Sequence, residues 1–176
     1  MVTGGVNASP ETLRLLSGLL ASPGSDSLAV LRELAGEHAW LAEPVAELEQ
    51  TRLDEWQSEH GRLFISGHPK TVCPPFESAF LGGAMFGDAC DQLGDLYRRI
   101  GLQADEGVPP DYLGTLLECA AYLREQPCGH SSELLQELWR EHVAPWVPRY
   151  GTVLQQESRL LLYRQLGQQL ADLSDE

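Results

Sequence analysis

The chain has 176 residues, of which 26 are acidic and 12 are basic, and its formal net charge is −14. This length is typical of one domain, so we expect a single domain over residues 1–176, with residues 1–8 disordered. The charge argues against a nucleic-acid partner and against an anionic membrane surface, because both attract clustered Lys and Arg. No basic residue precedes Arg14, and no apolar run approaches the about 18 residues of a membrane span. We therefore expect a cytoplasmic protein without stable membrane insertion.

The first half of the chain alternates leucine-rich helical patterns with one loop. Ser9, Pro10 and Glu11 form an N-cap, a first-turn proline and a first-turn acid, which predict a helix through Leu20. Two further helices are predicted over about residues 25–40 and 44–64, because leucines recur there on one helical face. The glycine and proline content of residues 65–75, ISGHPKTVCPP, predicts a loop.

The second half is also predicted to be helical. A short helix is expected over residues 75–80, a longer one over 85–100 that ends at Gly101, and another over 112–125 after a loop at 102–108. Pro127 breaks that helix, and Ser131-Ser132-Glu133 is expected to cap the next one. Prolines 145 and 148 interrupt the chain before a last helix, which is predicted over 158–173. The chain is poor in the β-branched residues that strands favour. These patterns predict a single compact all-α domain of about seven to nine helices.

The cysteines and histidines offer no obvious metal site. Cys73, Cys90, Cys119 and Cys128 are too few and too scattered for a disulfide scaffold, and no pair has the C-x-x-C spacing, so free thiols are expected. His38, His60 and His142 each directly follow a glutamate, and adjacent helical residues point apart. We therefore expect these histidines at the surface or at an interface, and we expect neither a metal nor a cofactor.

No motif of an enzyme stands out. The sequence contains no G-x-x-x-x-G-K-[ST] phosphate loop, no H-E-x-x-H and no Glu-x-x-His. The competing enzyme class is an all-α hydrolase or lyase built on Asp111, Glu77 and a histidine. Because carboxylates without a recognisable partner set rarely define a catalytic site, we expect the protein not to be an enzyme.

An ordered series of short motifs runs through nearly the whole chain. It consists of EHGRLF at residues 59–64, PPFESAF at 74–80, FGD at 86–88, PPDYLG at 109–114, PW at 145–146 and YRQLG at 163–167. In this order the motifs resemble the TorD/DmsD/NarJ family of cytoplasmic chaperones for molybdenum-cofactor oxidoreductases. Two positions depart from the family pattern. Tyr112 stands where the family has a histidine after the aspartate, and residues 65–74 lack the tryptophan that some members carry.

The resemblance implies a binding protein whose client is the N-terminal leader of a redox enzyme's catalytic subunit, often a twin-arginine export signal. Carboxylates would receive the guanidinium groups of such a leader, and an apolar groove would bury the segment that follows them. An alternative within the family is a NarJ-type chaperone for a molybdoenzyme that is not exported. The partner is therefore a leader peptide rather than a nucleic acid, and the chaperone is a monomer or a helix-exchanged homodimer. The peptide-binding residues that the resemblance implies are Leu63, Phe64, Pro75, Phe76, Glu77, Ser78, Phe80, Pro109, Asp111 and Tyr112.

These residues also have a structural interpretation. The aromatic side chains would belong to the core, and Glu77 and Asp111 would be acids in the first turn of a helix, where the helix dipole stabilises them. Asp111 is the position at which the two interpretations differ most. Pro109 and Pro110 fix the start of its helix, and Gly114 lets a neighbouring segment approach closely. Its carboxylate would then either cap the helix or receive an arginine of the client, and we favour the second role.

Overall fold

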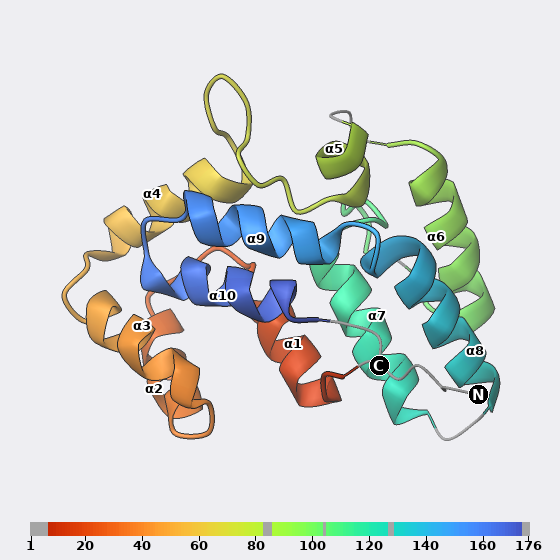
Figure 1. The fold of residues 1–176 in the computed structure, drawn as a ribbon, viewed down its shortest axis with the longest axis horizontal. Coiled ribbons are helices and arrows are strands. Elements are labelled where there is room, and N and C mark those ends of the chain that lie inside the picture. Colours follow the sequence, from red (N-terminus) through yellow and green to blue (C-terminus); the bar gives the residue numbers. More distant parts are fainter. Residues whose placement is uncertain (1–6, 83–85, 104, 127–128, 174–176) are drawn as a thin grey trace. The chain divides into compact units, whose positions relative to one another are not determined.

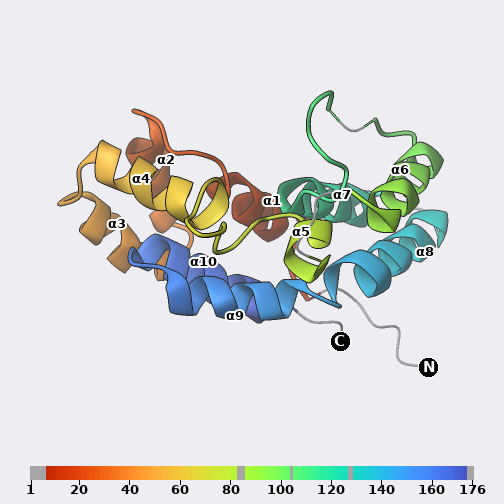
Figure 2. The ribbon, with the colours of Figure 1, turned by 90° about the horizontal axis from the view of Figure 1, so that it is seen from above.

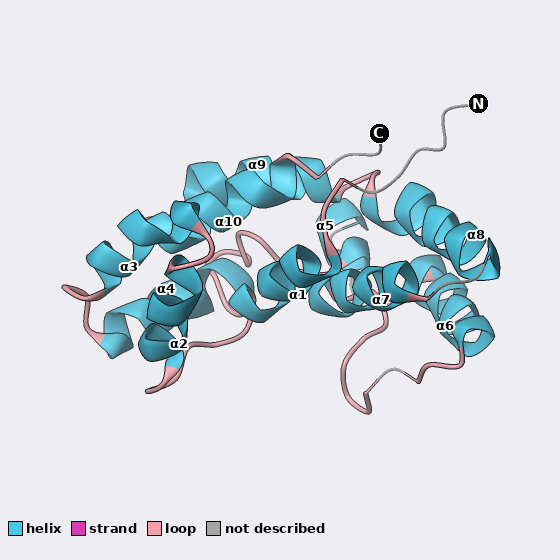
Figure 3. Cartoon of the chain, turned by 90° about the horizontal axis from the view of Figure 1, so that it is seen from below, coloured by secondary structure: helices cyan, strands magenta, loops and turns pink. Residues whose placement is uncertain are grey.

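The computed structural model describes residues 7–82, 86–103, 105–126 and 129–173, and most of these are helical (Figures 1 and 3). No strand occurs among the described residues, which confirms the all-α prediction. The helices are α1 (Pro10–Leu19), α2 (Ser27–Ala35), α3 (Ala42–Leu48), α4 (Leu53–Phe64), α5 (Glu77–Gly82), α6 (Asp88–Ile100), α7 (Leu113–Glu125), α8 (Gly129–Leu138), α9 (Val147–Glu157) and α10 (Leu161–Ala171). A 3₁₀ turn, Ala39–Leu41, precedes α3, and a π-helical turn, Trp139–Val143, follows α8. The described residues thus contain ten α-helices rather than seven to nine.

The chain divides into two compact units. The first unit comprises residues 1–20, 75–148 and 172–176, and the second comprises residues 21–74 and 149–171. Each has a leucine-rich core of its own. That they act as one domain stays a prediction.

In the first unit, α1 packs against α7, and α6 lies beside α8 (Figure 3). The hydroxyl of Ser17 on α1 donates a hydrogen bond of 3.1 Å to the carbonyl of Gly114 on α7. A Cβ at Gly114 would meet Ser17 Oγ at 3.2 Å and the Tyr112 ring at 2.4 Å, so a larger residue would crowd the contact with α1 and displace the Tyr112 ring. The predicted role of Gly114 is confirmed. Ala8 is buried in this unit too, whereas residues 1–6 of the expected disordered N-terminus lie outside the described residues.

In the second unit, α9 and α10 run side by side (Figures 1 and 2). Two glycines make the contact possible. A Cβ on Gly151 would lie 2.5 Å from the carbonyl oxygen of Gly167, and a Cβ on Gly167 would lie 2.6 Å from that of Gly151. The core of this unit also holds Trp56, whose indole Nε1 donates a hydrogen bond of 3.0 Å to the Tyr163 hydroxyl.

The helix boundaries follow the predictions in some places and depart from them in others. The Ser9 N-cap is confirmed, since its hydroxyl accepts a hydrogen bond of 3.1 Å from the amide of Thr12. The single helix expected over 44–64 is wrong. The hydroxyl of Thr51 bonds back to the carbonyl of Glu47 at 2.8 Å and Arg52 is extended, so α3 ends and α4 begins afresh at Leu53. Likewise the helix expected over 25–40 ends at residue 35.

The remaining corrections concern the C-terminal third. The prediction that Pro148 interrupts the chain is wrong, because Pro148 is the second residue of α9. This helix is absent from the predicted elements. Proline is tolerated there because the amides of a first turn have no intrahelical acceptor. The cap expected at residues 131–133 is also wrong, because α8 already starts at Gly129 and Ser131 is a buried residue inside it. The predicted starts and breaks at Met85 and Pro127 lie outside the described residues.

Candidate functional site

Two proline-rich segments of the first unit meet in a short antiparallel contact. The amide of Leu113 donates a hydrogen bond of 2.8 Å to the carbonyl of Pro75, and the amide of Glu77 donates one of 3.2 Å to the carbonyl of Asp111. Between these bonds, Phe76 and Tyr112 form an isolated β-bridge, and their ring centroids lie 5.5 Å apart. The motifs at residues 74–80 and 109–114, which contain eight of the ten predicted site residues, therefore lie together. We call residues 75–78 and 109–113 the corner.

Asp111 holds the corner together from inside. Its side chain is fully buried, and Oδ2 accepts hydrogen bonds from both the amide of Ser78, at 2.8 Å, and the Ser78 hydroxyl, at 2.5 Å. These bonds cap the N-terminus of α5. The expectation that Asp111 lies in the first turn of the helix that follows it is wrong, because α7 starts only at Leu113, with Tyr112 as its N-cap residue.

Other polar groups surround this carboxylate. The Tyr97 hydroxyl donates a hydrogen bond of 2.7 Å to the carbonyl of Pro110. Burial raises the pKa of the Cys90 thiol, and a hydrogen bond to Asp111 and the negative charge of that residue raise it further. The carboxylate is therefore buried among groups of α5, α6 and the corner, and only its Oδ1 lacks a hydrogen-bond partner within the described chain.

A second buried acid, Glu77, links α5 to the π-helical turn. Its Oε2 lies 2.9 Å from Nδ1 of His142. The carbonyl of His142 in turn accepts a hydrogen bond of 2.6 Å from the indole of Trp146, whose ring centroid lies 5.7 Å from that of Phe80. His60 and His142 were expected at the surface or at an interface, and both are buried inside the chain. His142 pairs with Glu77, and His60 packs on Phe64.

The ten predicted site residues fall into three groups. Pro75, Glu77 and Asp111 are buried in the corner, and five residues that surround them are half-buried: Phe76, Ser78, Phe80, Pro109 and Tyr112. Leu63 and Phe64 belong to the second unit and are buried in its core, where Phe64 packs on Tyr163 with 5.3 Å between ring centroids. The structure thus brings eight of the ten together in the first unit, and the partly exposed ones are mainly aromatic.

A cavity of about 340 Å³ opens between α5 and the start of α6. Its lining residues are Glu77, Ser78, Leu81, Gly82, Phe86, Gly87, Asp88 and Ala89. Phe86 and Leu81 are the exposed apolar side chains of this cavity, with 68% and 48% of their surfaces exposed. Phe86 also has a φ of 67°, which is uncommon for a residue other than glycine. Leu81, Phe86 and Asp88 are not among the predicted site residues, although the FGD motif contains two of them.

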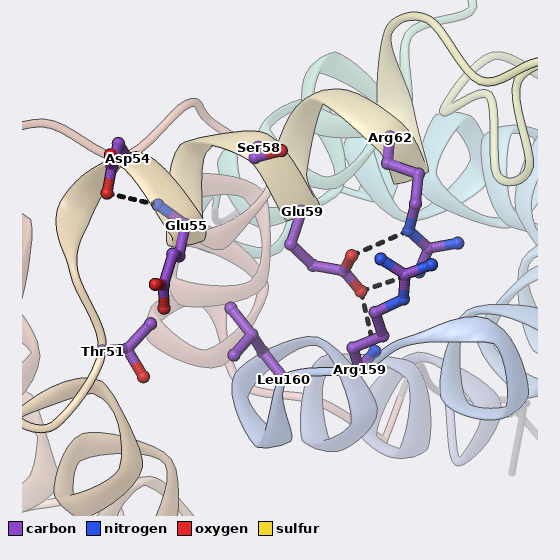
Figure 4. A pocket seen from close by; sticks show the side chains of 8 residues that line it. All are labelled: Thr51, Asp54, Glu55, Ser58, Glu59, Arg62, Arg159 and Leu160. Carbon is purple, nitrogen blue, oxygen red and sulfur yellow. Dashed lines mark hydrogen bonds and ion pairs between the residues drawn. The ribbon is translucent and has the colours of Figure 1, made fainter.

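The second unit has a larger cavity of about 530 Å³, lined by α4 and the turn between α9 and α10 (Figure 4). The buried carboxylate of Glu59 accepts two hydrogen bonds from the Arg62 guanidinium, at 2.7 and 2.8 Å, and one of 2.7 Å from the amide of Arg159. Burial raises the pKa of Glu59, but these bonds and the two positive charges outweigh it and hold the pKa below its usual value. The polar groups at this end of the cavity therefore satisfy one another, and they fasten the α9–α10 turn to α4.

The described parts of the chain hold neither a metal site nor a membrane-spanning helix. No three His, Cys, Asp or Glu side chains gather there closely enough to hold a metal ion. No helix in those parts is long and apolar enough to cross a membrane.

Comparison with known proteins decides the family. A family model described as nitrate reductase delta subunit matches residues 22–150, well over half of the chain. The chain belongs to this family. It is the TorD/DmsD/NarJ family that the ordered motifs resemble. The relatives named in the next comparison are chaperones or maturation proteins rather than enzymes.

Individual relatives agree with this assignment. The Tat proofreading chaperone DmsD of Salmonella typhi is 32% identical, in a match that covers 89% of this chain and 82% of the relative. The chaperone protein YcdY of Escherichia coli is 34% identical over 51% of this chain and 45% of its own. A crystal structure of a putative redox enzyme maturation protein from Archaeoglobus fulgidus has a TM-score of 0.69 at 27% identity, and the match covers 94% of this chain and 93% of the other.

Proposed function

We propose that this protein is a cytoplasmic maturation chaperone that binds the N-terminal, twin-arginine type leader of a molybdenum-cofactor oxidoreductase subunit. It holds this leader until the cofactor is inserted and the subunit is assembled. The proposal rests on the family and on the DmsD relatives, whose name describes a Tat proofreading chaperone. The partner is a peptide, and the protein acts without a nucleic acid and without stable insertion in a membrane. We expect the chaperone to be a monomer or a helix-exchanged homodimer.

The location proposed for the site rests on one observation: the corner lies beside the cavity of about 340 Å³, and Glu77 and Ser78 of the corner line it. Half-buried aromatic rings and exposed apolar side chains lie there next to carboxylates, in a protein of net charge −14. A leader with two arginines followed by apolar residues is complementary to both features. The partly exposed residues of the leader site are Phe76, Ser78, Phe80, Pro109 and Tyr112, and the buried ones are Pro75, Glu77 and Asp111. Leu63 and Phe64 act by stabilising the second unit.

Calorimetry tests this function directly. The full chain is titrated with a synthetic peptide that corresponds to the leader of a molybdoenzyme subunit encoded beside it. We expect one peptide per subunit and a Kd on the order of micromolar, because a disordered peptide must be ordered on binding. A scrambled peptide of the same composition serves as the control. Absence of binding to the leader would contradict the proposal.

A NarJ-type chaperone for a molybdoenzyme that stays in the cytoplasm is the second candidate. The description of the matched family, nitrate reductase delta subunit, favours it. The two candidates differ in the client and not in the chaperone site. Binding to a leader that contains two adjacent arginines, with weaker binding when both are replaced by glutamine, would favour the exported client.

A further inference from the structure

The cavity between α5 and α6 has acidic side chains and apolar side chains, which suit the arginines of the leader and the apolar segment that follows them. We infer that Asp88 receives an arginine of the leader at the mouth of this cavity, that Phe86 and Leu81 contact its apolar segment, and that Asp111 is a positioning residue. This inference rests on the proposed function.

Asp111 is unsuited to receive a guanidinium group directly. None of its side-chain surface is exposed, so neither oxygen is within reach of a peptide: Oδ2 is engaged by both hydrogen-bond donors of Ser78, and Oδ1 lacks a hydrogen-bond partner among the described residues but is buried as well. A guanidinium that replaced them would break the cap of α5 and the wall of the cavity that α5 provides. The buried carboxylate therefore acts on the leader through Ser78 and α5, which it holds in place.

Asp88 has the properties that Asp111 lacks. It is the exposed first residue of α6, it lines the cavity, and it forms no ion pair with any described Arg, Lys or His. The eight lining residues include a second carboxylate, Glu77, and no basic side chain. The charge of this cavity therefore favours a cation. An arginine is well suited because its planar guanidinium can bind a carboxylate with two parallel hydrogen bonds.

The apolar part of the cavity fits the segment that follows the arginines. Phe86 is two residues before Asp88, more than two thirds of its surface is exposed, and its backbone adopts the left-handed conformation. An exposed aromatic side chain in this conformation gains little from its own fold, so a bound partner is the simplest source of its packing. Leu81 lies on the α5 side of the same cavity. One peptide with a basic residue next to apolar residues would contact all three side chains.

The test compares three single variants of the full chain with two peptides. The variants are Asp88→Asn, Asp91→Asn and Asp111→Asn, and the peptides are the leader and the same leader with both arginines replaced by glutamine. Asp91 is the matched control, because it is an exposed acid one turn further along α6 that does not line the cavity. Calorimetry gives the Kd, and the thermal midpoint monitors folding.

We expect Asp88→Asn to raise the Kd for the native leader about tenfold and to leave the Tm unchanged. Tenfold is the lower end of the effect of losing a hydrogen bond to a charged group. Asp88→Asn should alter binding of the glutamine peptide by less than about twofold, and Asp91→Asn should alter either peptide equally little. Asp111→Asn should lower the Tm and weaken both peptides by the same factor, because it perturbs α5 rather than the arginine.

Two results would overturn the inference while the proposed function stands. In the first, the wild-type chain binds the leader, and Asp88→Asn and Asp91→Asn weaken it equally. In the second, Asp111→Asn weakens only the arginine peptide at an unchanged Tm, which would make Asp111 the receptor. Failure of the wild-type chain to bind the leader would instead contradict the proposed function.

Discussion

Oε2 of Glu77 lies 2.9 Å from Nδ1 of His142, and only 6% and 4% of the two residues' surfaces are exposed. Glu77 is the first residue of α5, and His142 belongs to the π-helical turn after α8. The pair therefore fixes one end of α5 from the side, while Asp111 caps it from the corner. A helix of only six residues has little stability of its own, so these two buried contacts decide where α5 lies.

We expect His142→Ala to destabilise the fold by about 3–5 kcal/mol, because it leaves the Glu77 carboxylate buried without its partner. The free energy of unfolding is measured with urea at neutral pH. The double variant Glu77→Gln/His142→Ala should cost less than the sum of the single variants. His130→Ala is the control, because the His130 side chain is 68% exposed, and its effect should stay within about 0.5 kcal/mol. Additive effects of the two single variants would contradict the coupling.

We expect Asp111→Ala to lower the free energy of unfolding by about 1–3 kcal/mol, since two half-buried donors of Ser78 lose a charged acceptor. Thermal and urea unfolding measure the loss. Asp105→Ala, an exposed acid in the preceding loop, should leave stability nearly unchanged. Equal stability of the two variants would show that the cap of α5 contributes nothing.

We expect Glu59→Gln to destabilise the protein at pH 7 by about 1–3 kcal/mol and to have a smaller effect at pH 3. The pKa of Glu59 is lowered in the folded state, so its ionisation stabilises the fold above the unfolded pKa, near 4.5. That contribution is lost as the pH falls through the lowered value. Urea unfolding between pH 3 and 7 measures the difference. Glu55→Gln, an exposed residue of the same cavity, is the control, and a pH-independent loss in Glu59→Gln would contradict the prediction.

We expect Gly151→Ala to destabilise the protein by at least about 2 kcal/mol, because the added Cβ would lie 2.4 Å from the backbone nitrogen of Ala171. Gly94→Ala is the matched control. Gly94 is also inside a helix, α6, and a Cβ there has no neighbour within 4 Å, so alanine should be neutral or stabilising by up to about 1 kcal/mol. Circular dichroism during thermal unfolding compares the two. A stable Gly151→Ala variant would contradict the close approach of α9 and α10.

We expect the cysteines to differ in reactivity toward a thiol reagent at pH 8. Burial raises the pKa of the thiols of Cys73 and Cys119 to about 12, so both should react only when the protein unfolds. Cys90 is half-buried and should react faster, although burial and Asp111 also raise its pKa. Mass spectrometry of the labelled peptides, in a Cys128→Ser background, gives the order. Labelling of Cys119 before Cys90 would contradict it.

Much of the fold could be predicted because it depends on local patterns. The leucine spacing and the Ser9 cap give α1, and the glycine and proline content of residues 65–75 gives the loop after α4. Local patterns did not predict the break at residues 49–52 or helix α9. Each depends on which of two locally acceptable conformations the surrounding residues stabilise, and Pro148 is compatible with either a break or a first helical turn.

The sequence by itself determined the all-α class, the family and the grouping of the two proline-rich motifs, because short-range periodicity and ordered motifs lie along the chain. Only the tertiary structure decided what the acids of these motifs do. Burial and the distance between partners depend on contacts between residues far apart in the sequence. Through such contacts Asp111 bonds to Ser78, and Glu77 pairs with His142. The same packing leaves Phe86 and Asp88 exposed beside a cavity. Neighbours far apart in the sequence set the surroundings of each carboxylate, so its role cannot be read from its own position in the chain.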